Sequence, residues 1–163
     1  MKKIVKTICC LLTLIALVTL ALAPATANAN PPAEVSGNYV FGNTTILEVR
    51  QASGNTIIKD VTNQVVNGDI AGSAIFERTF ILHSSGKYNI QGIDTITASV
   101  GGRSGTITLR IAGTGDLIAG TVQGKWTILS GTGELANLHG QGTLTGMSNV
   151  AGTYSGQIHF DPD

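Results

Sequence analysis

Apolar and polar residues alternate along almost the whole chain after residue 36. From Arg103 the odd positions read Arg, Gly, Ile, Leu, Ile and Gly, whereas the even positions read Ser, Thr, Thr, Arg and Ala. This period of two is typical of a strand with one buried face and one solvated face. Similar runs predict eight strands, at about 38–50, 55–66, 70–83, 88–100, 103–113, 118–129, 139–146 and 152–160. Short turns between them favour an antiparallel barrel or sandwich.

One segment breaks this rhythm. Gly131-Thr-Gly-Glu-Leu-Ala-Asn-Leu138 lacks the strict alternation. It predicts a single helical turn before the seventh strand.

Turn lengths predict which residues face one another. Asn67-Gly68 and Gly101-Gly102 are signals for two-residue hairpin turns. Ser85–Lys87 and Thr114–Leu117 are expected to form a three-residue and a four-residue loop. Opposed residues of an antiparallel pair share a face, and the apolar faces match across all four turns. The predicted partners are Val61 with Ala74, Arg78 with Asp94, Ile96 with Ile107, and Leu109 with Val122.

The chain contains 21 glycines, and their spacing decides between phosphate binding and close packing. A Walker loop requires GxxxxGK[ST], whereas Gly120-Thr-Val-Gln-Gly-Lys-Trp126 has a shorter spacing and Trp after Lys. A dinucleotide fingerprint requires GxGxxG at the start of a helix, and Gly113-Thr-Gly115 is followed by Asp-Leu-Ile. The predicted registers instead put glycines beside large inward residues, for example Gly105 beside Trp126. There they would relieve crowding in a curled sheet.

The N-terminal segment predicts export. Three lysines precede the apolar run Ile8–Leu22, and small-x-small sites follow it, which favours cleavage after Ala29. The domains are then a signal peptide (1–29), a linker (30–36) and a β-barrel domain (37–163). The protein is expected to be secreted or periplasmic, with no integral membrane span in its mature form. The alternative for the first segment is an uncleaved anchor.

Composition excludes several kinds of site. Both cysteines, Cys9 and Cys10, lie before the expected cleavage site, so the mature chain has no thiolate nucleophile or thiolate metal site. No basic patch occurs, so nucleic acid is not expected as a partner. The three histidines lack metal-ligand spacing, and no GxSxG motif of a serine hydrolase is present. No metal, nucleotide or other cofactor is expected, and a homo-oligomer is left open.

Four segments indicate a family: Gly68-Asp-Ile-Ala-Gly72, Val100-Gly-Gly-Arg-Ser-Gly-Thr-Ile-Thr-Leu109, Gly124-Lys-Trp-Thr-Ile128 and Gly131-Thr-Gly-Glu-Leu-Ala-Asn-Leu-His-Gly-Gln-Gly142. Over about residues 60–146 the chain resembles a bacterial domain-of-unknown-function family that is grouped with the plant allene oxide cyclases in one barrel-like superfamily. The resemblance implies an all-β fold, a single eight-stranded antiparallel up-and-down β-barrel, lipocalin-like in outline, with a lumen. It implies no activity. No functional position of the cyclases carries over to this chain.

The inward face predicted from the registers is mostly apolar, with four polar exceptions: Lys59, Asn63, Arg78 and Asp94. Arg78 is expected to oppose Asp94 directly, with Lys59 one inward row away. Such a buried pair can be purely structural. It can also form the polar end of an apolar pocket, where Arg78 or Lys59 meets a ligand carboxylate or carbonyl. The candidate ligand-binding residues are Lys59, Arg78, Asp94, Phe76, Phe80, Trp126 and Tyr154, and no catalytic residue is assigned.

Three functions follow from this interpretation. The first is a binding module for a small apolar or amphipathic molecule in the lumen. The second is an isomerase or cyclase that acts on such a molecule there, and the third is a structural or assembly role. An outer-membrane barrel is disfavoured, because Arg78 and Asp94 would then face lipid, at a cost of roughly 2–4 kcal/mol for the arginine and less for the aspartate.

Overall fold

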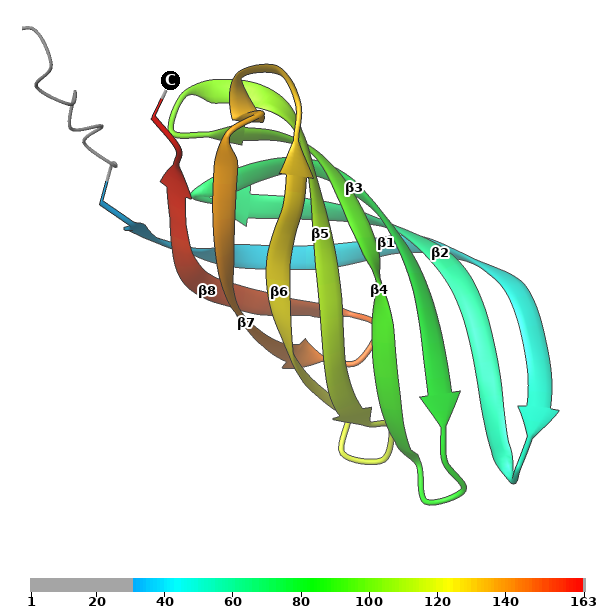
Figure 1. The fold of residues 1–163 in the computed structure, drawn as a ribbon. Helices are drawn as coiled ribbons and strands as arrows, with labels where there is room; N and C mark the ends of the chain where they lie inside the picture. Colours follow the sequence, from blue (N-terminus) through cyan, green and yellow to red (C-terminus); the bar gives the residue numbers. More distant parts are fainter. Residues whose placement is uncertain (1–30, 163) are drawn as a thin grey trace, which may run out of the picture.

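The computed structural model describes residues 31–162, which form eight antiparallel strands in one closed ring (Figure 1). The strands are β1 (Ala33–Ala52), β2 (Asn55–Gly68), β3 (Ile70–Leu82), β4 (Lys87–Val100), β5 (Arg103–Asp116), β6 (Thr121–Gly131), β7 (Leu138–Met147) and β8 (Ala151–Phe160). Each strand pairs with its neighbours in sequence, and β1 pairs with β8 to close the ring. The all-β prediction with eight antiparallel strands is confirmed. The expected signal peptide lies outside the described residues.

The single helical turn is also confirmed. A 3-10 turn, η2 (Gly133–Leu135), joins β6 to β7. Its Leu135 is fully buried, and Glu134 accepts a hydrogen bond at 2.8 Å from the backbone N–H of Ser104 on β5. The turn therefore closes one end of the ring.

Strand β1 is longer than the sequence predicts. It begins at Ala33, inside the segment 30–36 expected as a linker, because residues 33–40 pair with β8. Its pairing with β2 continues to Ala52 and is interrupted by two irregularities, at Phe41/Thr44 and Ile46/Glu48. The far ends of β1 and β2 extend past the shorter strands β6–β8 in Figure 1.

Glycines on the inward face make room for aromatic side chains. Trp126 lies over the paired glycines Gly142 and Gly156, because a Cβ atom added at either one would lie 2.5 Å from Cζ2 of Trp126. A second pair of glycines in β7 and β8 makes room for Tyr39 in the same way. The prediction that inward glycines relieve crowding is correct in kind. The predicted partner was wrong, since Gly105 packs near η2 and not beside Trp126.

The β4–β5 register agrees with the prediction, but the β2–β3 register differs from it. The last β2–β3 pair is Val66 with Gly72, so Asn67-Gly68 is not a two-residue hairpin turn. Asp69 instead binds β1: its N–H donates to Ser36 O at 3.0 Å, and its Oδ2 accepts from Ser36 N at 2.7 Å. The turn is thereby lengthened by an odd number of residues. An odd shift reverses the faces of a strand, so the even positions of β2 point inward.

The β3–β4 register also differs, although the inward faces remain as predicted. Arg78 pairs with Gly92 rather than with Asp94. The reason is that the three-residue turn lies one residue earlier than predicted, around residues 84–86, where a hydrogen bond from His83 N to Lys87 O closes it at 2.9 Å. The direct Arg78–Asp94 pairing was therefore wrong.

The β5–β6 register shows a similar shift. Leu109 pairs with Ile128 instead of Val122. The turn lies farther along the chain than predicted, because the Oδ1 atom of Asp116 accepts a hydrogen bond at 2.8 Å from Ile118 N. The register is displaced by six residues, an even number, so the same residues of β6 still face inward. Trp126 is therefore buried on the inward face, as predicted.

Candidate functional site

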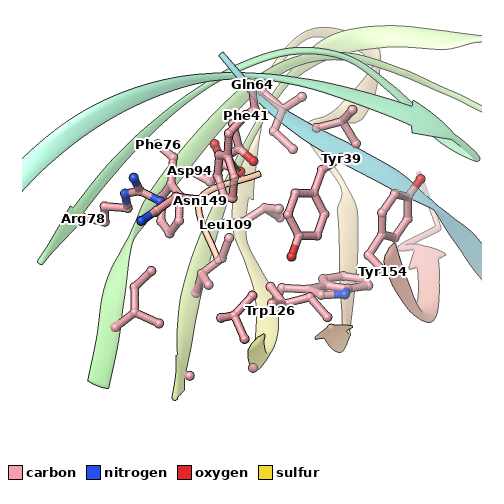
Figure 2. Close-up of a pocket in the computed structure, with 18 of the residues that line it drawn as sticks. Tyr39, Phe41, Gln64, Phe76, Arg78, Asp94, Leu109, Trp126, Asn149 and Tyr154 are labelled. Carbon is pink, nitrogen blue, oxygen red and sulfur yellow. Dashed lines mark hydrogen bonds between the residues drawn. The ribbon is translucent and has the colours of Figure 1, made fainter. Parts of the chain in front are cut away.

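A cavity of about 70 Å³ lies inside the ring, and Figure 2 shows it between aromatic side chains from several strands. Its walls are mostly aromatic and aliphatic. Arg78 lies on one side of it and Tyr154 on the opposite side (Figure 2). Its buried polar side chains come from neighbouring strands: Gln64 from β2, Arg78 from β3 and Asp94 from β4. Such a lining is typical of a small-molecule site.

Arg78 forms a buried ion pair with Asp60. Arg78 Nε lies 2.6 Å from Asp60 Oδ1, and Arg78 Nη2 donates to Asp60 Oδ2 at 3.4 Å. Only 2% of the Arg78 side chain and 6% of the Asp60 side chain are exposed. The guanidinium also lies 4.7 Å from the ring centre of Phe80 and 5.0 Å from that of Phe41, within cation–π range. The positive charge of Arg78 is therefore compensated by the protein itself.

Asp94 is buried and has no cationic partner within the described part of the chain. Its side chain accepts one hydrogen bond, from Gln64 Nε2 to Oδ2 at 2.7 Å. Its other oxygen, Oδ1, has no hydrogen-bond partner among residues 31–162. Burial raises the pKa of Asp94 from 3.8 to about 7, and the Gln64 hydrogen bond opposes that rise only in part. The carboxyl group therefore changes its charge near neutral pH.

Trp126 is the second buried side chain with an unsatisfied polar atom. Its indole Nε1 has no hydrogen-bond partner in the described part of the chain. The nearby Tyr154 hydroxyl, by contrast, is fully used: it accepts from Ile70 N at 2.9 Å and donates to Ile70 O at 3.1 Å. Trp126 Nε1 and Asp94 Oδ1 are therefore the two buried polar atoms of the lining that remain free within residues 31–162.

A second hollow adjoins the cavity, and we call it the mouth. Its volume is about 310 Å³, and it shares Arg78, Phe80, Tyr88 and Asn149 with the lining of the cavity. Its other walls include Ile46 on β1 and Leu117 in the β5–β6 turn, both of which are exposed. The mouth thus gives the cavity an apolar approach from the end of the ring that carries this turn.

The structure brings six of the seven candidate residues together. Phe76, Phe80, Arg78, Asp94, Trp126 and Tyr154 all line the cavity. Lys59 does not: it lies half-exposed on the outer face, with Nζ 2.7 Å from Glu48 Oε2. Asn63 is exposed as well. Both expectations failed because the β2–β3 turn is longer than predicted, which reverses the faces of β2.

Sequence reasoning missed Asp60 and Gln64, the β2 residues that contact the two candidate charges. The even positions of β2 from residue 60 read Asp, Thr, Gln and Val, whereas the odd positions include Val61 and Val65. Hydrophobicity alone therefore selects the wrong face of this strand. One sequence signal for the correct face was available. Asp60 is an acidic residue on the strand next to that of Arg78, so its carboxylate could compensate the buried positive charge of Arg78.

Within residues 31–162, no three His, Cys, Asp or Glu side chains are grouped so that they could hold a metal ion. The same residues include no helix of the length and apolar character needed to cross a membrane.

The sequence matches one protein family over most of its length. A family model described as "Protein of unknown function (DUF3224)" matches residues 36–157. The chain belongs to this family. A crystal structure of another DUF3224 protein of unknown function, from Shewanella oneidensis MR-1, has a TM-score of 0.63 with 18% identity, covering 82% of this chain and 100% of that one. The structural similarity concerns the fold, and no curated protein matches the chain.

Proposed function

We propose that this DUF3224 protein binds a small apolar or amphipathic molecule in its cavity. The observation that carries the proposal is the pair of buried, unpartnered atoms Asp94 Oδ1 and Trp126 Nε1 in one lining. A buried polar atom without a hydrogen bond costs about 1–3 kcal/mol, and folded proteins retain few of them. A ligand that hydrogen-bonds to both atoms would recover that free energy.

The dimensions of the site favour an amphipathic ligand. The cavity of about 70 Å³ is large enough for a polar head group, and the apolar mouth of about 310 Å³ could hold a hydrocarbon body. Exposed Ile46 and Leu117 in the mouth would gain from being covered, because burial of apolar surface is favourable by about 25 cal/mol per Å².

An isomerase or cyclase is the second candidate. The observation in its favour is that Asp94 has a pKa of about 7, which suits a general acid or base at neutral pH. If this candidate is correct, Asp94→Asn would keep the ligand bound and abolish its conversion. Retained conversion in the variant would contradict it.

We also propose that the protein is exported and that it shares the regular up-and-down barrel of the allene oxide cyclase superfamily. The support for export is the lysine-rich start, the apolar run and the small-residue site before Asn30. N-terminal sequencing of the protein from its own source tests this. A first residue at Asn30 is expected, and Met1 would contradict export by cleavage.

Native mass spectrometry of the protein purified from its own source tests the binding proposal. We expect a co-purified small molecule on the wild type and on Glu77→Leu, a matched control because Glu77 is an exposed carboxylate on β3. Asp94→Leu should fold, as judged by circular dichroism, and lose the molecule. A bare wild type that also takes up nothing from a lipid extract would refute the proposal.

A further inference from the structure

The hydrogen bond from Gln64 determines where Asp94 carries its proton. Because Gln64 Nε2 donates to Oδ2, that oxygen acts as an acceptor. The neutral carboxyl group therefore carries its proton on Oδ1, the oxygen without a partner. In this state Asp94 presents an O–H donor to the cavity.

Trp126 adds a second donor to the lining. The indole N–H can donate a hydrogen bond and cannot accept one. Trp126 Nε1 is buried and unpartnered, like Asp94 Oδ1. Acceptor atoms of a ligand would therefore satisfy both free polar atoms of the cavity.

Among residues 31–162, the lining of the cavity offers no free positive charge that could compensate an anionic head group. Arg78 is bonded to Asp60 and is flanked by phenylalanine rings. Lys59, the other cation once expected at the site, is on the outer face with Glu48. A ligand carboxylate beside Asp94 would lose its hydration without gaining a counter-charge, which is costly in an apolar site.

We propose that the ligand is a neutral molecule with acceptor oxygens, such as a ketone, ester or ether, to which Asp94 and Trp126 donate hydrogen bonds. Its apolar body lies in the mouth. This inference rests on the proposed binding function and specifies the chemical class of the ligand.

Ionisation of Asp94 would convert its donor into an acceptor and weaken such a ligand. The other titratable or charged groups facing the cavity or bonded to its lining are Tyr39 from β1, Asp60 from β2, Arg78 from β3, Tyr88 from β4 and Tyr154 from β8. Burial raises the pKa of Tyr39 to about 12 and also raises that of Tyr154, so both stay neutral at pH 9. Tyr88 shares a hydrogen bond with Ser148 at 2.8 Å, and Asp60 is bonded to Arg78. Asp94 is the carboxyl group of the lining that loses its proton between pH 6 and pH 9.

The intrinsic fluorescence of Trp126 provides the test, because it is the only tryptophan of the chain. The protein is titrated with 2-nonanone, nonanoate and nonylamine, which share a chain length and differ in charge. At pH 6 we expect the ketone to bind at least about tenfold more tightly than either charged compound. The neutral fraction of Asp94 falls from about nine-tenths at pH 6 to about one-hundredth at pH 9. The Kd of the ketone should therefore rise at least about tenfold at pH 9.

Two variants assign the pH effect. Asp94→Asn keeps an N–H donor that does not titrate, so it should bind the ketone equally at both pH values. Glu77→Gln, which neutralises an exposed carboxylate, should behave like the wild type. A pH dependence of ketone binding in Asp94→Asn equal to that of the wild type would overturn the role of Asp94. If the variant does not fold, the Kd of the ketone for the wild type at pH 6 and at pH 9 still tests the inference.

Three other results of the fluorescence titration would overturn the inferred ligand class. Equal affinity for the ketone at pH 6 and pH 9, or equal or tighter binding of nonanoate or nonylamine, would overturn the inference. So would the absence of any fluorescence response to the three compounds. A co-purified charged molecule in native mass spectrometry would overturn the ligand class and leave the proposed function intact, whereas a bare protein there counts against both.

Discussion

Replacing Asp94 by Asn should stabilise the unliganded protein at alkaline pH and have little effect at acidic pH. The pKa of this carboxyl is about 7 in the folded protein, against an ordinary value of 3.8. Between these values the folded protein holds the proton and the unfolded chain releases it, so stability falls as pH rises. Above pH 7 both forms have lost the proton and the loss is complete. Three pKa units correspond to about 4 kcal/mol in total, of which about 2–3 kcal/mol falls between pH 5 and pH 8.

Denaturant unfolding at pH 5 and pH 8 measures this effect. The wild type should lose about 2–3 kcal/mol more than Asp94→Asn over this interval, which corresponds to roughly 10 °C in Tm. Groups common to both proteins cancel in the difference. Glu77→Gln is the control and should follow the wild type, because Glu77 is exposed. Parallel pH profiles for the wild type and Asp94→Asn would refute the reasoning, since Asp94 would then be solvated or paired.

Two further predictions concern packing. Arg78→Met leaves Asp60 buried and unpaired, which should lower the free energy of unfolding in urea by about 3–5 kcal/mol. The double variant Arg78→Met/Asp60→Leu should recover much of this loss. Strictly additive losses from the two substitutions would argue against the ion pair. Gly142→Ala puts a methyl group against the backbone oxygen of Ser155 and the ring of Trp126 and should cost at least about 1–3 kcal/mol, whereas Gly42→Ala makes an ordinary contact at 3.4 Å and should be near neutral. Equal thermal melts for the two alanine variants would contradict the glycine–aromatic packing.

The alternation of residues predicts the strands well, because it reports a local property of each strand. The inward positions of Phe76, Arg78, Asp94 and Trp126 follow directly from it. The β2–β3 turn could not be predicted in the same way, because its geometry depends on Asp69 binding a residue of β1 that is 33 positions earlier. Such long-range contacts leave no trace in the period of the sequence.

The same dependence on long-range contacts explains which residues of the candidate site could be predicted from the sequence and which could not. Arg78 and Asp94 stand out as charges on an apolar face, so their burial is predictable. Their actual partners, Asp60 and Gln64, lie on β2, where the inward residues 60, 62 and 64 are polar and the outward residues 61 and 65 are valines. A single error of register therefore put Lys59 inside and left Asp60 outside.

We infer that the unpartnered atoms of Asp94 and Trp126 serve a ligand. The alternative is that ordered water satisfies them, since a cavity of about 70 Å³ has room for water. A crystal structure of the protein purified from its own source, examined for density within hydrogen-bond distance of Asp94 Oδ1 and Trp126 Nε1, distinguishes the two most directly. We expect continuous density of one bound molecule that contacts both atoms and extends into the mouth. Isolated waters bonded to both atoms, with an empty mouth, would contradict it.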